Sequence, residues 1–178
     1  AIHDAVQNLD VDGVRRELAA GANADVLDEE GYTPLYVACK ATSLAKAIRE
    51  EKVREREAIV AALLRAGANV NARCRGVYGP AHHLAPLKSA CFDKGFPPSN
   101  IVAQLIAAGA DIEAADINGF FPLYTAAQSG RADTVSRLLA AGADPHRRLF
   151  GTTTIIHGAT LTGNVRTYAT LLRAGAAL

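Results

Sequence analysis

The sequence predicts an all-α solenoid, in which short helix-turn-helix units stack in one row around a continuous core. Two repeated features predict this fold. Small residues followed by Gly-Ala return five times, with the glycine at Gly21, Gly67, Gly109, Gly142 and Gly175. An apolar anchor near the start of each unit also recurs, at Ile2, Leu35, Leu87, Leu123 and Ile156. The last step in both series is 33 residues, and such a period with local insertions is typical of repeat arrays.

We expect a single domain over residues 1–178, divided into five units. Their approximate bounds are 1–27, 28–72, 73–115, 116–148 and 149–178. The pattern of apolar residues in the first unit predicts two short helices, from His3 to Asn8 and from Val11 to Ala20. The repeated glycine follows the second helix of each unit, where the left-handed backbone that ends a helix favours glycine.

The start of unit two carries a specific resemblance. Its sequence GYTPLYVAC, from Gly31 to Cys39, is similar to the helix-opening signature T-P-L-H-x-A of the ankyrin repeat family. Threonine caps the free N–H groups of the helix, and proline fits its first turn. The stretch from Leu138 to Asp144, LLAAGAD, is also close to the family pattern, and the resemblance covers essentially the whole chain. It implies an ankyrin-repeat solenoid with β-hairpin-like fingers between its units.

Insertions make units two and three longer than the others. Residues 41–58 are rich in Glu, Lys and Arg and contain no Pro or Gly, so we expect both helices of unit two to extend past their neighbours. A solvated protrusion and a partner-specific arm are both compatible with this insertion. The connection from Arg73 to Leu84 predicts one long finger, and the turn from Asp93 to Asn100 has three extra residues.

Charge and hydropathy narrow the classes of partner. The net charge is +1, from 19 basic and 18 acidic residues, which gives no overall attraction to nucleic acid or to an anionic membrane. The fingers alternate between acidic and basic, which fits a protein partner better than a duplex. No run of 18 apolar residues is present, so no membrane span is predicted.

The three cysteines of the chain give information about its cellular compartment. Cys39 and Cys91 occupy equivalent places in units two and three, which favours small buried side chains over reactive thiols. Three cysteines cannot all pair within one chain, so a cytoplasmic location is weakly favoured. A periplasmic or secreted location stays open if an N-terminal signal was removed.

The residues that commonly carry chemistry have structural interpretations here. His3 and His157 match the histidine of the signature, which ties the turns of adjacent repeats together in the family; Tyr36, Lys88 and Tyr124 replace it elsewhere. A metal site from His82, His83 and Cys74 is conceivable but disfavoured, because adjacent histidines rarely bind one ion. We expect no catalytic site, no metal and no cofactor.

The resemblance implies that finger tips and exposed first-helix positions contact partners. The candidates at those positions are Glu29, Glu30, Tyr32, Lys40, Tyr78, His82, His83, Leu84, Phe92, Ile117, Asn118, Phe120, Gln128, Ser129 and Phe150. The four aromatic rings in the fingers, Tyr32, Tyr78, Phe120 and Phe150, predict a row of exposed anchors. Packing of each ring against the next finger is the alternative.

These observations predict a monomeric, non-enzymatic module that binds a protein partner through its finger tips and concave face. Two alternatives stay open. The chain is an inhibitor or protective regulator of a specific enzyme, whose active site receives the long finger of residues 73–84. Otherwise it is the binding portion of a larger effector or signalling protein.

Overall fold

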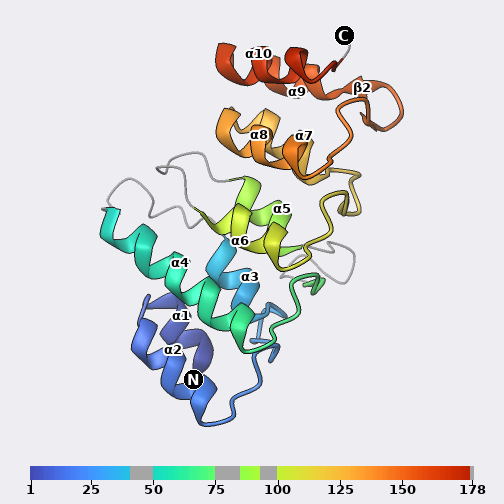
Figure 1. Ribbon diagram of the computed structural model, residues 1–178. Coiled ribbons are helices and arrows are strands. Elements are labelled where there is room, and N and C mark those ends of the chain that lie inside the picture. The colour runs from blue at the N-terminus through green and yellow to red at the C-terminus, as the bar shows by residue number, and fades with distance from the viewer. Residues whose placement is uncertain (41–49, 75–84, 93–99, 177–178) are drawn as a thin grey trace.

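The chain forms a single row of stacked helix pairs (Figure 1). The computed structural model describes residues 1–40, 50–74, 85–92 and 100–176. The elements are α1 Ile2–Gln7, α2 Val11–Ala19, α3 Pro34–Cys39, α4 Glu50–Arg65, α5 Pro86–Cys91, α6 Ile101–Ala107, α7 Pro122–Gln128, α8 Ala132–Ala140, β1 Arg148–Leu149, β2 Thr153–Thr154, α9 Ile155–Thr160 and α10 Val165–Arg173. The all-α solenoid is therefore confirmed.

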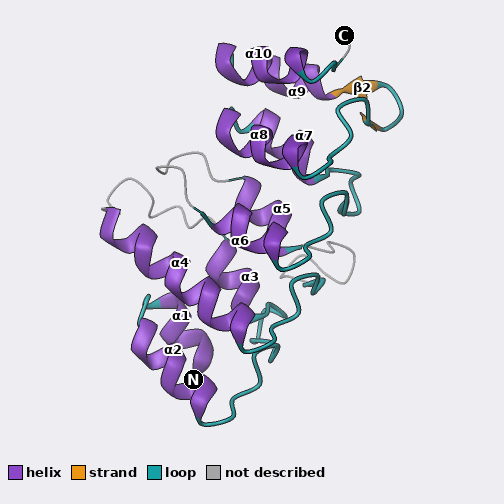
Figure 2. Ribbon diagram, viewed as in Figure 1, coloured by secondary structure: helices purple, strands orange, loops and turns teal. Residues whose placement is uncertain are grey.

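Two parallel tiers of helices build the row. The inner helices α1, α3, α5, α7 and α9 each contact the next inner helix, and the outer helices α2, α4, α6, α8 and α10 do the same. The described parts of the connections between pairs lie along one side of the stack (Figure 2). All five apolar anchors of the inner helices are buried in one continuous core. None of the described helices is long and apolar enough to cross a bilayer.

Local sequence sets the ends of these helices. The Thr33 hydroxyl accepts a hydrogen bond from the Tyr36 N–H at 3.2 Å, and Pro34 occupies the first helical position of α3. At the other end, all five repeated glycines adopt positive φ values between 83° and 97°. After α8, the Ala143 N–H donates to the Leu138 carbonyl at 3.0 Å, which satisfies a carbonyl that has no partner within the helix.

The extension of unit two differs from the prediction. Its outer helix α4 has 16 residues, whereas α2, α8 and α10 have nine. The predicted extension of the inner helix is wrong, because α3 ends at Cys39 and Lys40 adopts an extended backbone. Residues 41–49 of the insertion lie outside the described residues.

A ladder of hydrogen bonds joins neighbouring units through the segments that follow the outer helices. The Asp25 carboxylate accepts from the Asn69 N–H at 2.9 Å, across 44 residues of sequence. The Asn71 side chain accepts from the Asp111 N–H at 2.8 Å and donates to the Gly109 carbonyl at 3.1 Å. Each acceptor stands four residues after a helix-ending glycine, so the repeat itself places it against the next unit.

All three cysteines are free and buried. Cys39 and Cys91 lie within the core, as their positions predicted, and the Cys74 sulfur accepts from the Thr33 N–H at 3.4 Å. Burial raises the pKa of Cys91 to about 12, and it raises the pKa values of Cys39 and Cys74 as well. These thiols therefore remain protonated at neutral pH.

Replacement of Asn71 tests the ladder. Asn71→Ala removes two hydrogen bonds between units, and we expect the free energy of unfolding to fall by about 1–2 kcal/mol, measured by urea titration. Asn118→Ala is the matched control, because it makes the same chemical change at an exposed finger tip. Equal effects of the two variants would contradict a coupling role for Asn71.

The buried thiols predict a loss of stability at alkaline pH. Above about pH 8.5, thiols of the unfolded chain lose protons while those of the folded chain keep them. A raised folded pKa stabilises the fold below that pH, so stability falls as pH rises, by up to about 1.4 kcal/mol per pH unit for each thiol. Cys91→Ala reproduces the Ala127 of unit four at the equivalent position. It should reduce the slope of unfolding free energy between about pH 9 and about pH 10, and an unchanged slope would refute the assignment.

Candidate interaction surface

An aspartate organises the finger that leads into unit four. Asp116 Oδ1 accepts hydrogen bonds from the N–H groups of Asn118 and Phe120, both at 2.9 Å. The turn closes with the Asp116 N–H donating to the Phe120 carbonyl, and it leaves Ile117 and Asn118 exposed at its tip. This turn holds the tip in place before any partner binds.

The finger that leads into unit two is built in the same way. Asp28 Oδ1 accepts from the N–H groups of Glu30 at 3.0 Å and Tyr32 at 2.8 Å. Glu29 and Glu30 are exposed at this tip. The sequences DEEGY and DINGF therefore encode one finger geometry twice, with an acidic tip in the first and an Ile-Asn tip in the second.

In units one and three, the residue after the apolar anchor links its unit to the next finger. His3 Nε2 lies 3.0 Å from the Tyr32 carbonyl oxygen, which confirms its predicted role. The Lys88 ammonium pairs with the second carboxylate oxygen of Asp116, and these side chains are only 16% and 6% exposed. His157 differs, because its Nδ1 lies 2.7 Å from the hydroxyl of Thr154 in its own unit.

Tyr32 does not belong to an exposed aromatic row. The expectation that its ring is exposed is wrong, since Tyr32 is only 4% exposed. Its ring stacks on Tyr36 with centroids 4.8 Å apart, and the Lys40 ammonium lies 4.7 Å from its centroid. The tyrosine that replaces the signature histidine thus supplies the surface that buries Tyr32.

Apolar side chains are exposed at the fingers of units four and five. Ile117 is 46% exposed and Phe150 is 70% exposed, whereas Phe120 is half-buried. The Phe120 and Phe150 rings meet edge to face at 6.4 Å, so Phe120 packs against the next finger. Phe150 is therefore an exposed aromatic anchor, as predicted, whereas Phe120 is partly covered by Phe150.

Phe150 also adopts an uncommon backbone conformation. It precedes Gly151 at the tip of the β1–β2 hairpin, in which Leu149 pairs with Thr153. Its φ is 54°, in the left-handed region that L-residues with a Cβ avoid at a cost of roughly 1–2 kcal/mol. Asparagine before glycine is the favoured pair in such a turn. The chain therefore places a large apolar ring where neither local backbone energy nor burial favours it.

A hollow of about 350 Å³ lies beside the fingers, between α3, α5 and α7. Its lining residues are Tyr36, Lys40, Ala85, Lys88, Ser89, Phe92 and Thr125. The predicted candidates Lys40 and Phe92 thus meet in one hollow. Burial raises the pKa of Tyr36 to about 12, and a hydrogen bond with the Ser89 side chain opposes part of this rise.

Sequence reasoning missed Ser89 and Thr125 as lining residues. Both stand two residues after an apolar anchor, Leu87 or Leu123, so an alignment of the units carries the signal that identifies them. The candidates Gln128 and Ser129 are half-buried at the end of α7. Neither lines this hollow.

Several candidates fall in segments that the structure does not describe. Tyr78, His82, His83 and Leu84 lie outside the described residues, and so does most of the predicted long finger. Within the described residues, no group of three or more His, Cys, Asp or Glu side chains is arranged to hold a metal ion.

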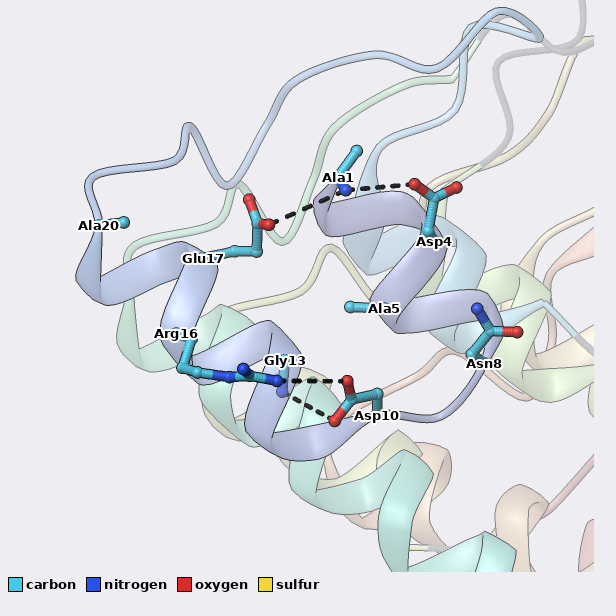
Figure 3. Close-up of a pocket in the computed structure, with 9 residues that line it drawn as sticks. All are labelled: Ala1, Asp4, Ala5, Asn8, Asp10, Gly13, Arg16, Glu17 and Ala20. Atoms are coloured by element: carbon cyan, nitrogen blue, oxygen red, sulfur yellow. Dashed lines mark hydrogen bonds and ion pairs between the residues drawn. The ribbon is translucent and has the colours of Figure 1, made fainter.

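A second hollow lies on unit one, between α1 and α2 (Figure 3). Its charged groups pair with one another: the Ala1 amino group lies 3.2 Å from the Asp4 carboxylate, and Arg16 lies 3.8 Å from Asp10. Asp10 also caps α2 by accepting from the Gly13 N–H at 2.8 Å. Because these contacts serve the helix ends, we do not place the interaction surface here.

Comparison with known families agrees with the signature residues. A model described as ankyrin repeats in three copies matches residues 87–178, more than half of the chain. A model of the single ankyrin repeat matches residues 30–75. The chain matches none of the curated proteins with which it was compared.

Substitution of Asp116 tests how the exposed finger is held. Asp116→Ala removes the acceptor of two N–H groups and leaves the buried Lys88 ammonium unpaired, which should lower the free energy of unfolding by about 3 kcal/mol. Asp28→Ala removes the same two N–H contacts in the other finger, where no ion pair to Asp28 is present among the described residues. Urea titrations should therefore show a larger loss for Asp116→Ala, and equal losses would argue against the ion pair.

Proposed function

Because the chain belongs to the ankyrin repeat family, we propose that it is a non-catalytic module that binds a protein partner. The proposed contact surface consists of the finger tips of units four and five and the hollow beside them. Ankyrin repeats are generally protein-protein interaction modules, and repeat arrays offer extended surfaces that suit such partners.

The observation that carries this proposal is the position of Phe150. Its ring is exposed and its backbone is left-handed, so the residue lowers the stability of the turn that holds it. Exposed aromatic rings are frequent anchors of protein interfaces, where their burial supplies much of the binding free energy. A role in binding accounts for a residue that the fold itself disfavours.

The neighbouring residues support the same surface. Ile117 adds a second exposed apolar side chain on the adjoining finger, and Phe120 of that same finger contacts the Phe150 ring. Asp116 and the β1–β2 pairing hold the two fingers, so little conformational entropy is lost when a partner binds. Insertion of the long finger of residues 73–84 into an enzyme depends mainly on residues 75–84, which lie outside the described residues, so no described contact favours that function.

Replacement of Phe150 by asparagine separates binding from stability. Phe150→Asn relieves the left-handed strain but removes the edge-to-face contact with Phe120, and these opposing effects are each about 1 kcal/mol. We therefore expect the free energy of unfolding to change by less than about 1 kcal/mol, whereas partner binding weakens at least about tenfold. Chemical denaturation measures the first, and quantitative affinity capture from the native source measures the second.

Leu172→Gln provides the matched control for this experiment. Leu172 is an exposed apolar residue on α10, away from the fingers, so its replacement should leave capture unchanged. Capture of the same proteins in the same amounts by wild type and Phe150→Asn would rule out the proposed surface.

A further inference from the structure

We propose that the hollow between α3, α5 and α7 binds one aspartate or glutamate side chain of the partner, presented beside an apolar residue in an extended segment. This inference rests on the proposed function, because it assigns chemistry to part of the same surface. It goes beyond that function by stating which residue the partner must contribute and which side chain receives it.

The lining of the hollow is rich in hydrogen-bond donors. Its polar side chains end in the ammonium groups of Lys40 and Lys88 and in the hydroxyl groups of Tyr36, Ser89 and Thr125. The ammonium groups can only donate hydrogen bonds, whereas the hydroxyl groups can donate or accept and those of Tyr36 and Ser89 bond to each other. The described lining contains no carboxylate. A ligand that supplies acceptor oxygens therefore complements it.

Lys40 provides the uncompensated charge. Lys88 is already paired with Asp116, so its charge is largely neutralised within the fold. Among the residues that the structure describes, no acidic side chain pairs with Lys40, whose ammonium rests over the Tyr32 ring. The described lining thus offers one positive charge that is not paired with a carboxylate, which matches a single carboxylate of a partner.

Phe92 adds an apolar wall to the hollow. It follows α5 and is 50% exposed, and Ala85 lies at the start of the same helix. A volume of about 350 Å³ is at the small end of ligand sites, which suits one or two side chains rather than a folded element. A partner residue with a carboxylate and an apolar residue beside it together match the charge, the apolar wall and the volume of the hollow.

The surrounding charges favour one acidic residue over a phosphate group or an acidic run. Phosphate recognition usually relies on arginine, whose planar fork binds two oxygens, and the described lining of the hollow contains no arginine. The finger beside Lys40 carries Glu29 and Glu30 at its exposed tip, and their charges repel a segment with several carboxylates. The same finger therefore limits the negative charge of the partner.

Peptide selection on the purified chain tests this inference. Random peptides displayed on phage are selected on immobilised wild-type protein, and enriched peptides are then measured by fluorescence anisotropy. We expect enrichment of a lone Asp or Glu beside an apolar residue, and about tenfold weaker binding of these peptides to Lys40→Gln. Lys52→Gln removes an exposed lysine from α4 and is the matched control, with unchanged binding expected.

The outcomes separate this inference from the proposed function. Absence of enrichment, enrichment without an acidic residue, or equal binding to wild type and Lys40→Gln would overturn it. The same peptides are also made with phosphoserine in place of the Asp or Glu. Tighter binding of the phosphoserine peptides would show that the hollow prefers a phosphate to a carboxylate, and it would also overturn the inference. Loss of binding to Phe150→Asn but not to Lys40→Gln would place recognition at the finger tip alone, which leaves the proposed function intact.

Discussion

The stack depends on apolar contact between neighbouring inner helices. A helix as short as α3, with six residues, is not stable alone in water, so it forms only while Leu35 is buried against α1 and α5. Each unit contacts only its neighbours, and extra residues are therefore tolerated where they lie outside the shared core. In α4 the additional turns precede the buried residues Ile59 and Leu63, which keep their place in the row.

The repeated parts of the fold were predictable from sequence, because each has a local physical cause. Glycine ends the outer helices by adopting positive φ, and Thr33 caps α3 whatever the surrounding units contain. Tyr32 was misjudged because its burial depends on a contact outside the pattern. Tyr36 replaces the signature histidine, and its larger ring supplies the stacking surface that draws Tyr32 inward. The residues of the finger alone do not contain that information.

The candidate site, like the fold, could be predicted from the sequence only in part. The exposure of Phe150 followed from its place in a finger, but the hollow required side chains from three inner helices to be brought together. Lys88 was identified only as a replacement for the signature histidine. Its pairing with Asp116 is the reason that we propose Lys40, rather than Lys88, as the charge available to a partner. That distinction depends on distance and burial, which residue spacing does not specify.

The two proposed contact regions are linked through the structure that lies between them. Asp116 holds the finger that carries Ile117, while its ion pair fixes Lys88 in the wall of the hollow. Phe120 of this finger contacts Phe150, and the Lys88 ammonium lies 5.8 Å from the Phe120 ring centroid. Because one carboxylate holds the finger of unit four and also pairs with Lys88 in the hollow, the spacing of these two parts is set by the fold. A partner that fits both must therefore match a fixed separation as well as the chemistry of each.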